Sequence, residues 1–177
     1  MSTYRAWYLS LTAVLMVPGE LVAQAQEEAP LRMIYAVWSD TTGAGYAMQN
    51  MSKSARDLVE ASVVLVKAKD GRVEVKQRQN KAGGSVRALQ ASQIVDTAVA
   101  RLSAAPPGAA DSTSGYAPSA HTSRLSEEDL TKLKGMFGPG ESALILLSPK
   151  PAVSEIQRSL GVGTQSDAEI VELEVQE

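Results

Sequence analysis

The 177-residue sequence contains no cysteine, a single histidine and few aromatic residues. Without cysteine there can be no disulfide, zinc–thiolate site, iron–sulfur cluster, cysteine nucleophile or lipoprotein anchor. Because only one Phe and two Trp occur, any core must consist mainly of Val, Leu, Ile, Met and Ala. We therefore expect a fold held together by aliphatic burial, with no cofactor and no metal.

The sequence also lacks a strong excess of charge of either sign. It has 17 Lys and Arg against 20 Asp and Glu, which gives a formal net charge of −3. A general nucleic-acid-binding protein carries a strongly basic face or segment. The mild acidity of this chain argues against nucleic acid as its partner.

One apolar run near the N-terminus, residues 6–17, follows the single charge of Arg5. Pro18 and Gly19 end it, and Ala23-Gln24-Ala25 has the small-x-small pattern that signal peptidase recognises. The run is shorter than the roughly 20 residues of a membrane-spanning helix. We expect residues 1–25 to be a signal peptide, with an uncleaved anchor as the alternative. The protein would then be periplasmic or exported, and membrane-associated if the anchor is kept.

The first half of the mature chain predicts a strand, a helix and a hairpin. Residues 33–38 are apolar and β-rich, and residues 44–59 repeat apolar side chains at helical spacing. Residues 62–69 and 72–77 predict two strands, because Asp70-Gly71 between them is typical of a tight turn.

The second half adds helices and strands around a region of low complexity. Residues 85–102 predict a helix with Leu89 among its apolar members, and residues 103–123 are rich in Ala, Pro, Gly, Ser and Thr, which predicts a flexible linker. Beyond it, capping residues and apolar patterning predict a helix, a central strand, a helix and an alternating strand at residues 126–137, 142–148, 151–160 and 169–175.

This order, β-α-β-β, helix and linker, α-β-α-β, predicts an α+β fold. We expect a ferredoxin-like open sheet with helices on one face. Residues 26–177 are predicted to form a single domain with the helix and linker inserted, because neither half has enough strands to bury itself.

Three stretches resemble a family of small bacterial envelope-associated proteins that carry a domain of unknown function. Residues 57–66 with 70–77 look like the family's strand hairpin, residues 130–147 like its helix-turn-strand, and the last helix and strand like its C-terminal unit. The resemblance implies a ferredoxin-like α+β fold and no catalytic residue. Family members usually carry a Gly/Ala-rich membrane hairpin in the middle; here residues 85–123 replace it with charges and a Pro/Gly/Ser-rich segment.

Few residues of the sequence suggest chemistry. His121 lies in the predicted linker, where no carboxylate holds it as a catalytic base requires. The acidic run Glu127-Glu128-Asp129 fits the start of a helix better than a metal site. The turn Thr42-Gly43-Ala44-Gly45 could present backbone N–H groups to an anion, but it lacks the glycine spacing of dinucleotide sites and the lysine of a P-loop.

The clearest surface feature is a concentration of positive charge on the predicted hairpin. Charged strands also keep sheet edges from pairing, which is the simpler explanation. As a functional alternative we predict an interaction patch for an acidic partner or anionic lipid headgroups, made of Lys67, Lys69, Arg72, Lys76, Arg78 and Lys81.

These features together favour a non-enzymatic accessory or protein-interaction domain of the bacterial cell envelope, such as a peripheral subunit of a larger membrane complex. The alternative is a small-ligand-binding or sensor protein of the periplasm, which would use the space between sheet and helices. A carboxylate- and hydroxyl-based enzyme is the least favoured class, so we expect no enzymatic activity.

The leader can be tested directly. N-terminal sequencing of the protein purified from the envelope should begin at Gln26, because signal peptidase would cut after Ala25. An intact Met1 or Ser2 end would show that the leader is kept.

Overall fold

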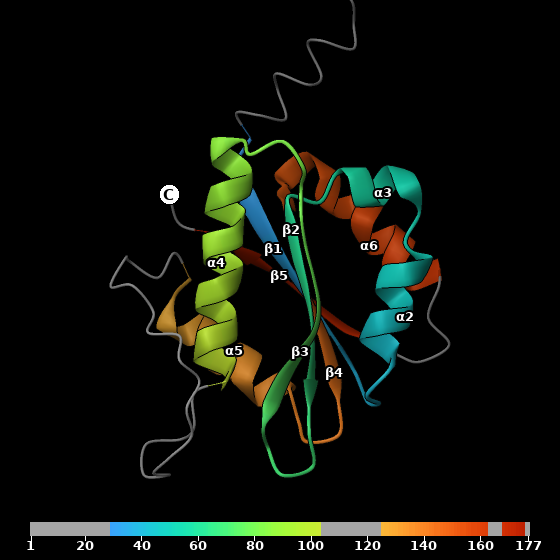
Figure 1. Ribbon diagram of the computed structural model, residues 1–177, viewed down its shortest axis with the longest axis vertical. Coiled ribbons are helices and arrows are strands. Elements are labelled where there is room, and N and C mark those ends of the chain that lie inside the picture. Colours follow the sequence, from blue (N-terminus) through green and yellow to red (C-terminus); the bar gives the residue numbers. More distant parts are fainter. Residues whose placement is uncertain (1–28, 104–124, 163–167, 176–177) are drawn as a thin grey trace, which may run out of the picture.

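The computed structural model describes residues 29–103, 125–162 and 168–175. They form an α+β fold around one open, antiparallel five-stranded sheet with the order β3-β2-β4-β1-β5 (Figure 1). The predicted signal peptide, and the predicted linker beyond Ser103, lie outside the described residues. The strands are β1 (Leu31–Trp38), β2 (Ala61–Lys67), β3 (Val73–Asn80), β4 (Ser142–Pro149) and β5 (Glu169–Glu174).

The order of elements along the chain agrees with the predicted order. The helices are α2 (Gly43–Asn50), α3 (Lys53–Asp57), α4 (Val86–Ser103), α5 (Glu127–Met136), the short 3-10 helix η1 (Lys150–Ala152) and α6 (Val153–Val162).

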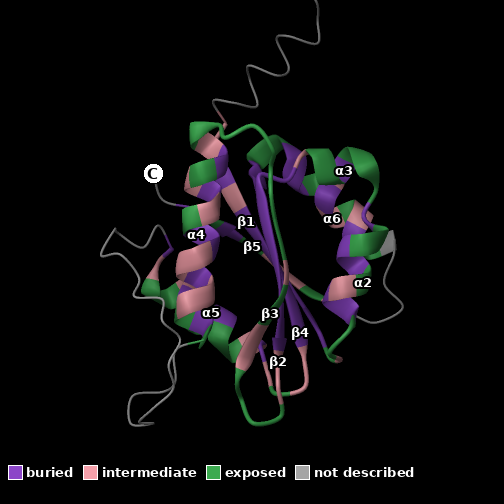
Figure 2. Cartoon of the chain, in the orientation of Figure 1, coloured by how far each residue is buried: buried purple, intermediate pink, exposed green. Residues whose placement is uncertain are grey.

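The centre of the sheet is the antiparallel pair of β1 and β4, whose register runs from Leu31 opposite Pro149 to Trp38 opposite Ser142. β4 is buried along its whole length, as its apolar sequence predicts for a central strand (Figure 2). Since successive side chains of a strand point to opposite faces, both faces of this pair are apolar and both need a cover.

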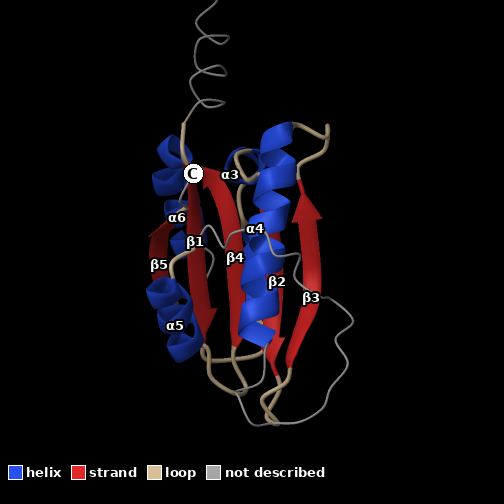
Figure 3. Ribbon diagram, turned by 90° about the vertical axis from the view of Figure 1, so that its left-hand side faces the viewer, coloured by secondary structure: helices blue, strands red, loops and turns tan. Residues whose placement is uncertain are grey.

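Helices cover both faces of the sheet, so the prediction of helices on one face is wrong. α4 and α5 pack on the face that carries Met33 and Tyr35, whereas α2, α3 and α6 pack on the face that carries Ile34 and Trp38 (Figures 1 and 3). The physical reason lies in β1 and β4 themselves. The apolar runs 33–38 of β1 and 143–147 of β4 would leave one apolar face in water if all helices lay on the other.

The single helix predicted over residues 44–59 is two helices in the structure. α2 ends at Asn50, and Met51 adopts an extended backbone with φ −55° and ψ 133°. Ser52 then begins α3, because its hydroxyl accepts a hydrogen bond from the backbone N–H of Ala55 at 3.2 Å. The break lets Met51 bury its side chain against the sheet. Helical periodicity alone did not reveal this change of direction.

The β2–β3 hairpin forms where predicted and is longer on its second strand. Gly71 occupies the turn with φ +87°, a conformation that favours glycine. Val64 pairs with Gln77 but Leu65 pairs with Val75, so Lys76 is the extra residue of a β-bulge. Beyond the bulge, β3 continues along the edge of the sheet to Asn80.

α4 buries most of the apolar side chains predicted for it, including Val95, Ala98 and Leu102, but not Leu89. Ala91, Ile94 and Ala98 are buried, whereas Leu89, expected to be a core residue, is 58% exposed. At 100° per residue, Leu89 lies about 180° around the helix from the buried Ala98, so it points away from the sheet. Leu89 and Val86, which is 73% exposed, then lie one turn apart on the outer side of α4.

Two glycines in the first turn of α2 give a matched test of the packing. A Cβ on Gly43 would lie 2.5 Å from Cγ of the fully buried Trp38, whereas a Cβ on Gly45 would have no neighbour within 4 Å. Gly43→Ala should lower the free energy of unfolding by about 1–3 kcal/mol. Gly45→Ala should raise it by up to about 1 kcal/mol, because alanine favours the helix. Urea unfolding of both variants measures the difference, and equal effects would contradict this packing.

Candidate functional site

The predicted interaction patch lies along the β2–β3 hairpin, at the edge of the sheet. Its six cations span the hairpin from the turn to the residue after β3: Lys67, Lys69, Arg72, Lys76, Arg78 and Lys81. A strand advances about 3.3 Å per residue, so Arg72 and Lys81 lie up to about 30 Å apart. The six side chains therefore do not form one cluster.

Lys67 has a structural position at the end of β2. Its Nζ donates a hydrogen bond to the backbone oxygen of Phe137 at 2.7 Å and lies 5.6 Å from the centre of the Phe137 ring. The backbone N–H of Gly140 donates to the oxygen of Lys67 at 2.7 Å. A cation here stabilises the carbonyl end of α5. Lys67 thus holds the α5–β4 connection against β2.

Arg78 and Lys81 are likewise paired within the protein. Arg78 forms an ion pair with Asp96 of α4 and donates to the Ser92 hydroxyl at 2.8 Å. Lys81 Nζ lies 2.9 Å from Oε1 of Glu60, whose side chain is only 5% exposed. A buried carboxylate is costly without a partner. Both cations therefore hold β3 in place, one against α4 and the other against the start of β2.

The remaining three cations lie at the turn end of the hairpin, in the same short stretch of chain as the exposed Val75. We call Lys69, Arg72, Val75 and Lys76 the hairpin tip. Val75 is 51% exposed, and Glu74 lies 2.6 Å from Lys76 Nζ and 3.0 Å from an Arg72 guanidinium nitrogen. The hydrogen bond from Lys76, and then the charges of Lys76 and Arg72, lower the pKa of Glu74. The hairpin tip is thus a solvated surface with alternating charges.

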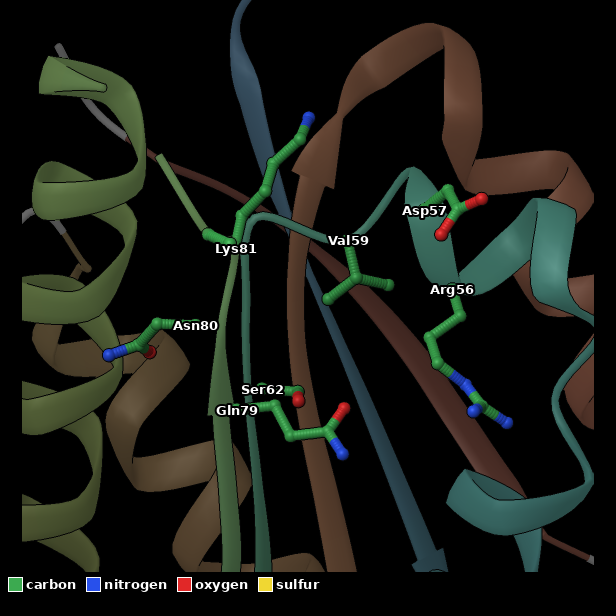
Figure 4. Close-up of a pocket in the computed structure, with 8 residues that line it drawn as sticks. Arg56, Asp57, Val59, Ser62, Gln79, Asn80 and Lys81 are labelled. Atoms are coloured by element: carbon green, nitrogen blue, oxygen red, sulfur yellow. The ribbon is translucent and has the colours of Figure 1, made fainter. Parts of the chain in front are cut away.

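A second candidate is an open hollow of about 380 Å³ between α3 and the far end of the hairpin (Figure 4). Figure 4 shows that the side chain of Asn80 turns away from it toward α4, where its Nδ2 lies 3.4 Å from the Ser92 hydroxyl. The lining residues are Arg56, Asp57, Val59, Ser62, Gln79, Asn80, Lys81 and Ala82.

The two cations of the hollow already have partners. The Arg56 guanidinium donates to the backbone oxygens of Gln49 at 3.0 Å and Met51 at 3.1 Å, at the end of α2. Lys81 is paired with Glu60. Polar groups of Asp57 and Gln79 remain, and they can hydrogen-bond a small polar molecule. Because the hollow is open, such a molecule would keep much of its contact with water.

The glycine turn before α2 uses its N–H groups internally. The Asp40 carboxylate accepts hydrogen bonds from the backbone N–H of Thr42 at 2.6 Å and of Gly43 at 2.7 Å. The Ser142 hydroxyl accepts one from the N–H of Ala44 at 3.0 Å. Because these backbone N–H groups already have acceptors, few of them remain for an anion. The contacts indicate that the turn serves to start α2.

The other residues that suggested chemistry divide into two groups. His121 lies outside the described residues. Asp129 belongs to a helix start, because its N–H donates to the Ser126 hydroxyl at 3.0 Å and its carboxylate accepts from that hydroxyl at 2.6 Å. In the part of the chain that the structure describes, no three His, Asp or Glu side chains gather where they could hold a metal ion.

The hollow and the buried carboxylate were missed in the sequence. Asp57 and Gln79 line the same hollow only because β3 runs back beside the connection between α3 and β2. No local sequence pattern predicts that these two segments are neighbours. Glu60 offered a signal: it lies between Val59 and Ala61 in an apolar stretch, and all three residues are buried. A charge in such a stretch predicts a buried ion pair.

Comparisons with known proteins add no relative. No family model, curated protein or solved structure matches this chain. The resemblance to an envelope-associated family therefore stays a prediction. Among the described residues, no helix is both long enough and apolar enough to cross a bilayer.

The role of Asp40 as a helix-start residue predicts a pH-dependent stability. The hydrogen bonds from Thr42, side chain first and then backbone, lower the pKa of Asp40. Its stabilising contribution is therefore complete above the unfolded-state pKa of about 3.9 and is lost as the pH falls through the folded value. Asp40→Ala should cost about 1 kcal/mol at pH 7.

Unfolding of wild type and Asp40→Ala at a series of pH values tests this expectation. The difference between the two proteins should shrink toward zero below pH ~4. A difference that stays constant from neutral to acidic pH would show that the carboxylate charge is not the cause.

Proposed function

We propose that this chain is a non-enzymatic accessory or protein-interaction domain of the bacterial cell envelope, acting as a peripheral subunit of a larger membrane complex. The hairpin tip is the surface that binds the partner. The observation that carries this proposal is the exposed Val75 on the same hairpin end as Lys69, Arg72 and Lys76, at the open edge of the sheet.

The composition of the hairpin tip resembles that of a protein interface. A central apolar side chain with a polar, charged rim excludes water on contact and sets the orientation of the partner. Residues 69–76 together carry one net positive charge, because the three cations of the tip outnumber Asp70 and Glu74 by one. An acidic partner is therefore favoured, and its association should weaken as salt screens the charges.

The topology supports a ferredoxin-like core, the fold that the family resemblance implies. In the order β3-β2-β4-β1-β5, β4 separates β1 from β2, and β1 separates β4 from β5. The connections β1-α2-α3-β2 and β4-α6-β5 place their helices on one face. In this proposal β3, α4 and α5 are an insertion that extends one edge and covers the other face. Their place in the chain overlaps the site of the family's membrane hairpin.

The second candidate function is a periplasmic small-ligand-binding or sensor protein. The hollow beside α3 favours it, since Asp57 and Gln79 offer hydrogen-bonding groups in a hollow that the apolar Val59 also lines. The open shape of the hollow ranks this candidate below partner binding.

A charge-reversal pull-down tests the role of the hairpin tip. The tagged protein is recovered from the envelope fraction of its own cells in mild detergent, as wild type and as the triple variant K69E/R72E/K76E. Because the tip would then repel an acidic partner, recovery of the co-purifying protein should fall at least about tenfold. Recovery by the wild type should fall with rising salt.

A matched control reverses three exposed cations elsewhere, Lys132 and Lys134 on α5 and Arg158 on α6. K132E/K134E/R158E should recover the partner as wild type does, because its net charge equals that of the first variant. Equal loss in both variants would show a nonspecific charge effect. Recovery of the wild type as a monomer without a partner would contradict the proposal.

A further inference from the structure

We infer that the start of α4 docks on the surface of a phospholipid bilayer through Val86 and Leu89. This inference rests on the envelope location in the proposed function. It concerns a different surface from the hairpin tip, at the opposite end of the hairpin.

The apolar contribution comes from the first two turns of α4. Val86 and Leu89 are 73% and 58% exposed, and their spacing places them side by side on one face of the helix. They are two of the four large exposed apolar side chains of the described residues; the others are Tyr46 and Val75, on separate elements. A pair at the end of a helix can enter the headgroup region while the helix backbone stays hydrogen-bonded.

The first described residues lie at this same end. The Arg87 guanidinium donates a hydrogen bond to the backbone oxygen of Ala29, and the backbone N–H of Lys150 donates to the oxygen of Pro30 at 3.0 Å. Figure 1 shows the chain entering beside the first turn of α4, at the top of the view. The Arg87 side chain, the backbone of Lys150 and the start of an 18-residue helix therefore lie beside the entry point.

The length of chain before this entry point identifies the occupant. The apolar residues 6–17 are separated from Ala29 by residues 18–28, which could reach at most about 40 Å when fully extended. While residues 6–17 are in a bilayer, as an anchor or as a leader awaiting cleavage, the end of α4 is held near that bilayer. Glu27 and Glu28 offset part of the cationic charge, so apolar insertion contributes more than headgroup attraction.

Because the chain contains no cysteine, a single added cysteine can carry an environment-sensitive fluorophore. The full chain is reconstituted in phosphatidylcholine vesicles containing phosphatidylglycerol, with the label at Leu89→Cys or, as a control, at Lys132→Cys on α5. The label at position 89 should shift its emission to the blue and be quenched by lipids brominated on their acyl chains. The label at position 132 should respond to neither.

Two added substitutions distinguish docking from general adhesion. Val86→Glu in the Leu89→Cys chain should reduce the quenching about tenfold, because the neighbouring charge opposes insertion. Tyr46→Glu, which places the same charge at another exposed apolar side chain on α2, should leave the quenching unchanged. Quenching at position 89 no greater than at position 132 would overturn the inference.

Shielding of position 89 in native membranes but not in lipid vesicles would also overturn the inference, and would identify this face as a protein interface. The pull-down reports on the hairpin tip alone. Partner recovery combined with an unquenched label would therefore reject lipid docking without touching the proposed function.

Discussion

The structure depends on the double-faced apolar character of the two central strands. β1 and β4 pair along their whole length and expose neither face to water. Met33, Tyr35 and Ile145 require one helical layer, and Ile34, Trp38 and Leu144 require the other. With no disulfide to close a partial core, both layers must form for the strands to be buried. The buried hydroxyl of Tyr35 donates a hydrogen bond to the backbone oxygen of Leu133 at 3.4 Å. Desolvation, and then the charge of Glu141, raise the pKa of this hydroxyl.

The strands were predictable because their signals are local, whereas the layers were not. The continuous apolar run of β4 and the Asp70-Gly71 turn indicate a central strand and a hairpin without reference to the rest of the chain. Which face a helix covers depends on contacts between distant segments. The same limit explains Met51, since burial of that side chain is gained by breaking the helix. Leu89 is different, because local spacing alone places it on the outer side of α4, about 180° around the helix from the buried Ala98.

For the charged residues of the candidate site, prediction from sequence has the same limit, because contacts between distant segments decide their partners. The sequence reveals six cations in a short stretch but not their partners. Lys67, Arg78 and Lys81 bind Phe137, Asp96 and Glu60, which come from three other parts of the chain. Only the cations next to the turn keep the surface role that the sequence suggested for all six. Pairing also explains how the edge strand tolerates Arg78 and, just after it, Lys81, because Asp96 and Glu60 each neutralise one charge and fix the strand to its neighbours.

The two proposed surfaces are compatible with one orientation of the molecule. The turn of the β2–β3 hairpin and the first turn of α4 lie at opposite ends of the sheet (Figure 1). If the start of α4 rests on the bilayer, the hairpin tip points away from the headgroups, a strand length or more from them. The tip then meets a partner that projects from the membrane, and its cations serve protein recognition rather than lipid binding. In this arrangement lipid docking would limit the rotation of the domain, so that the hairpin tip meets the partner at a defined height above the membrane.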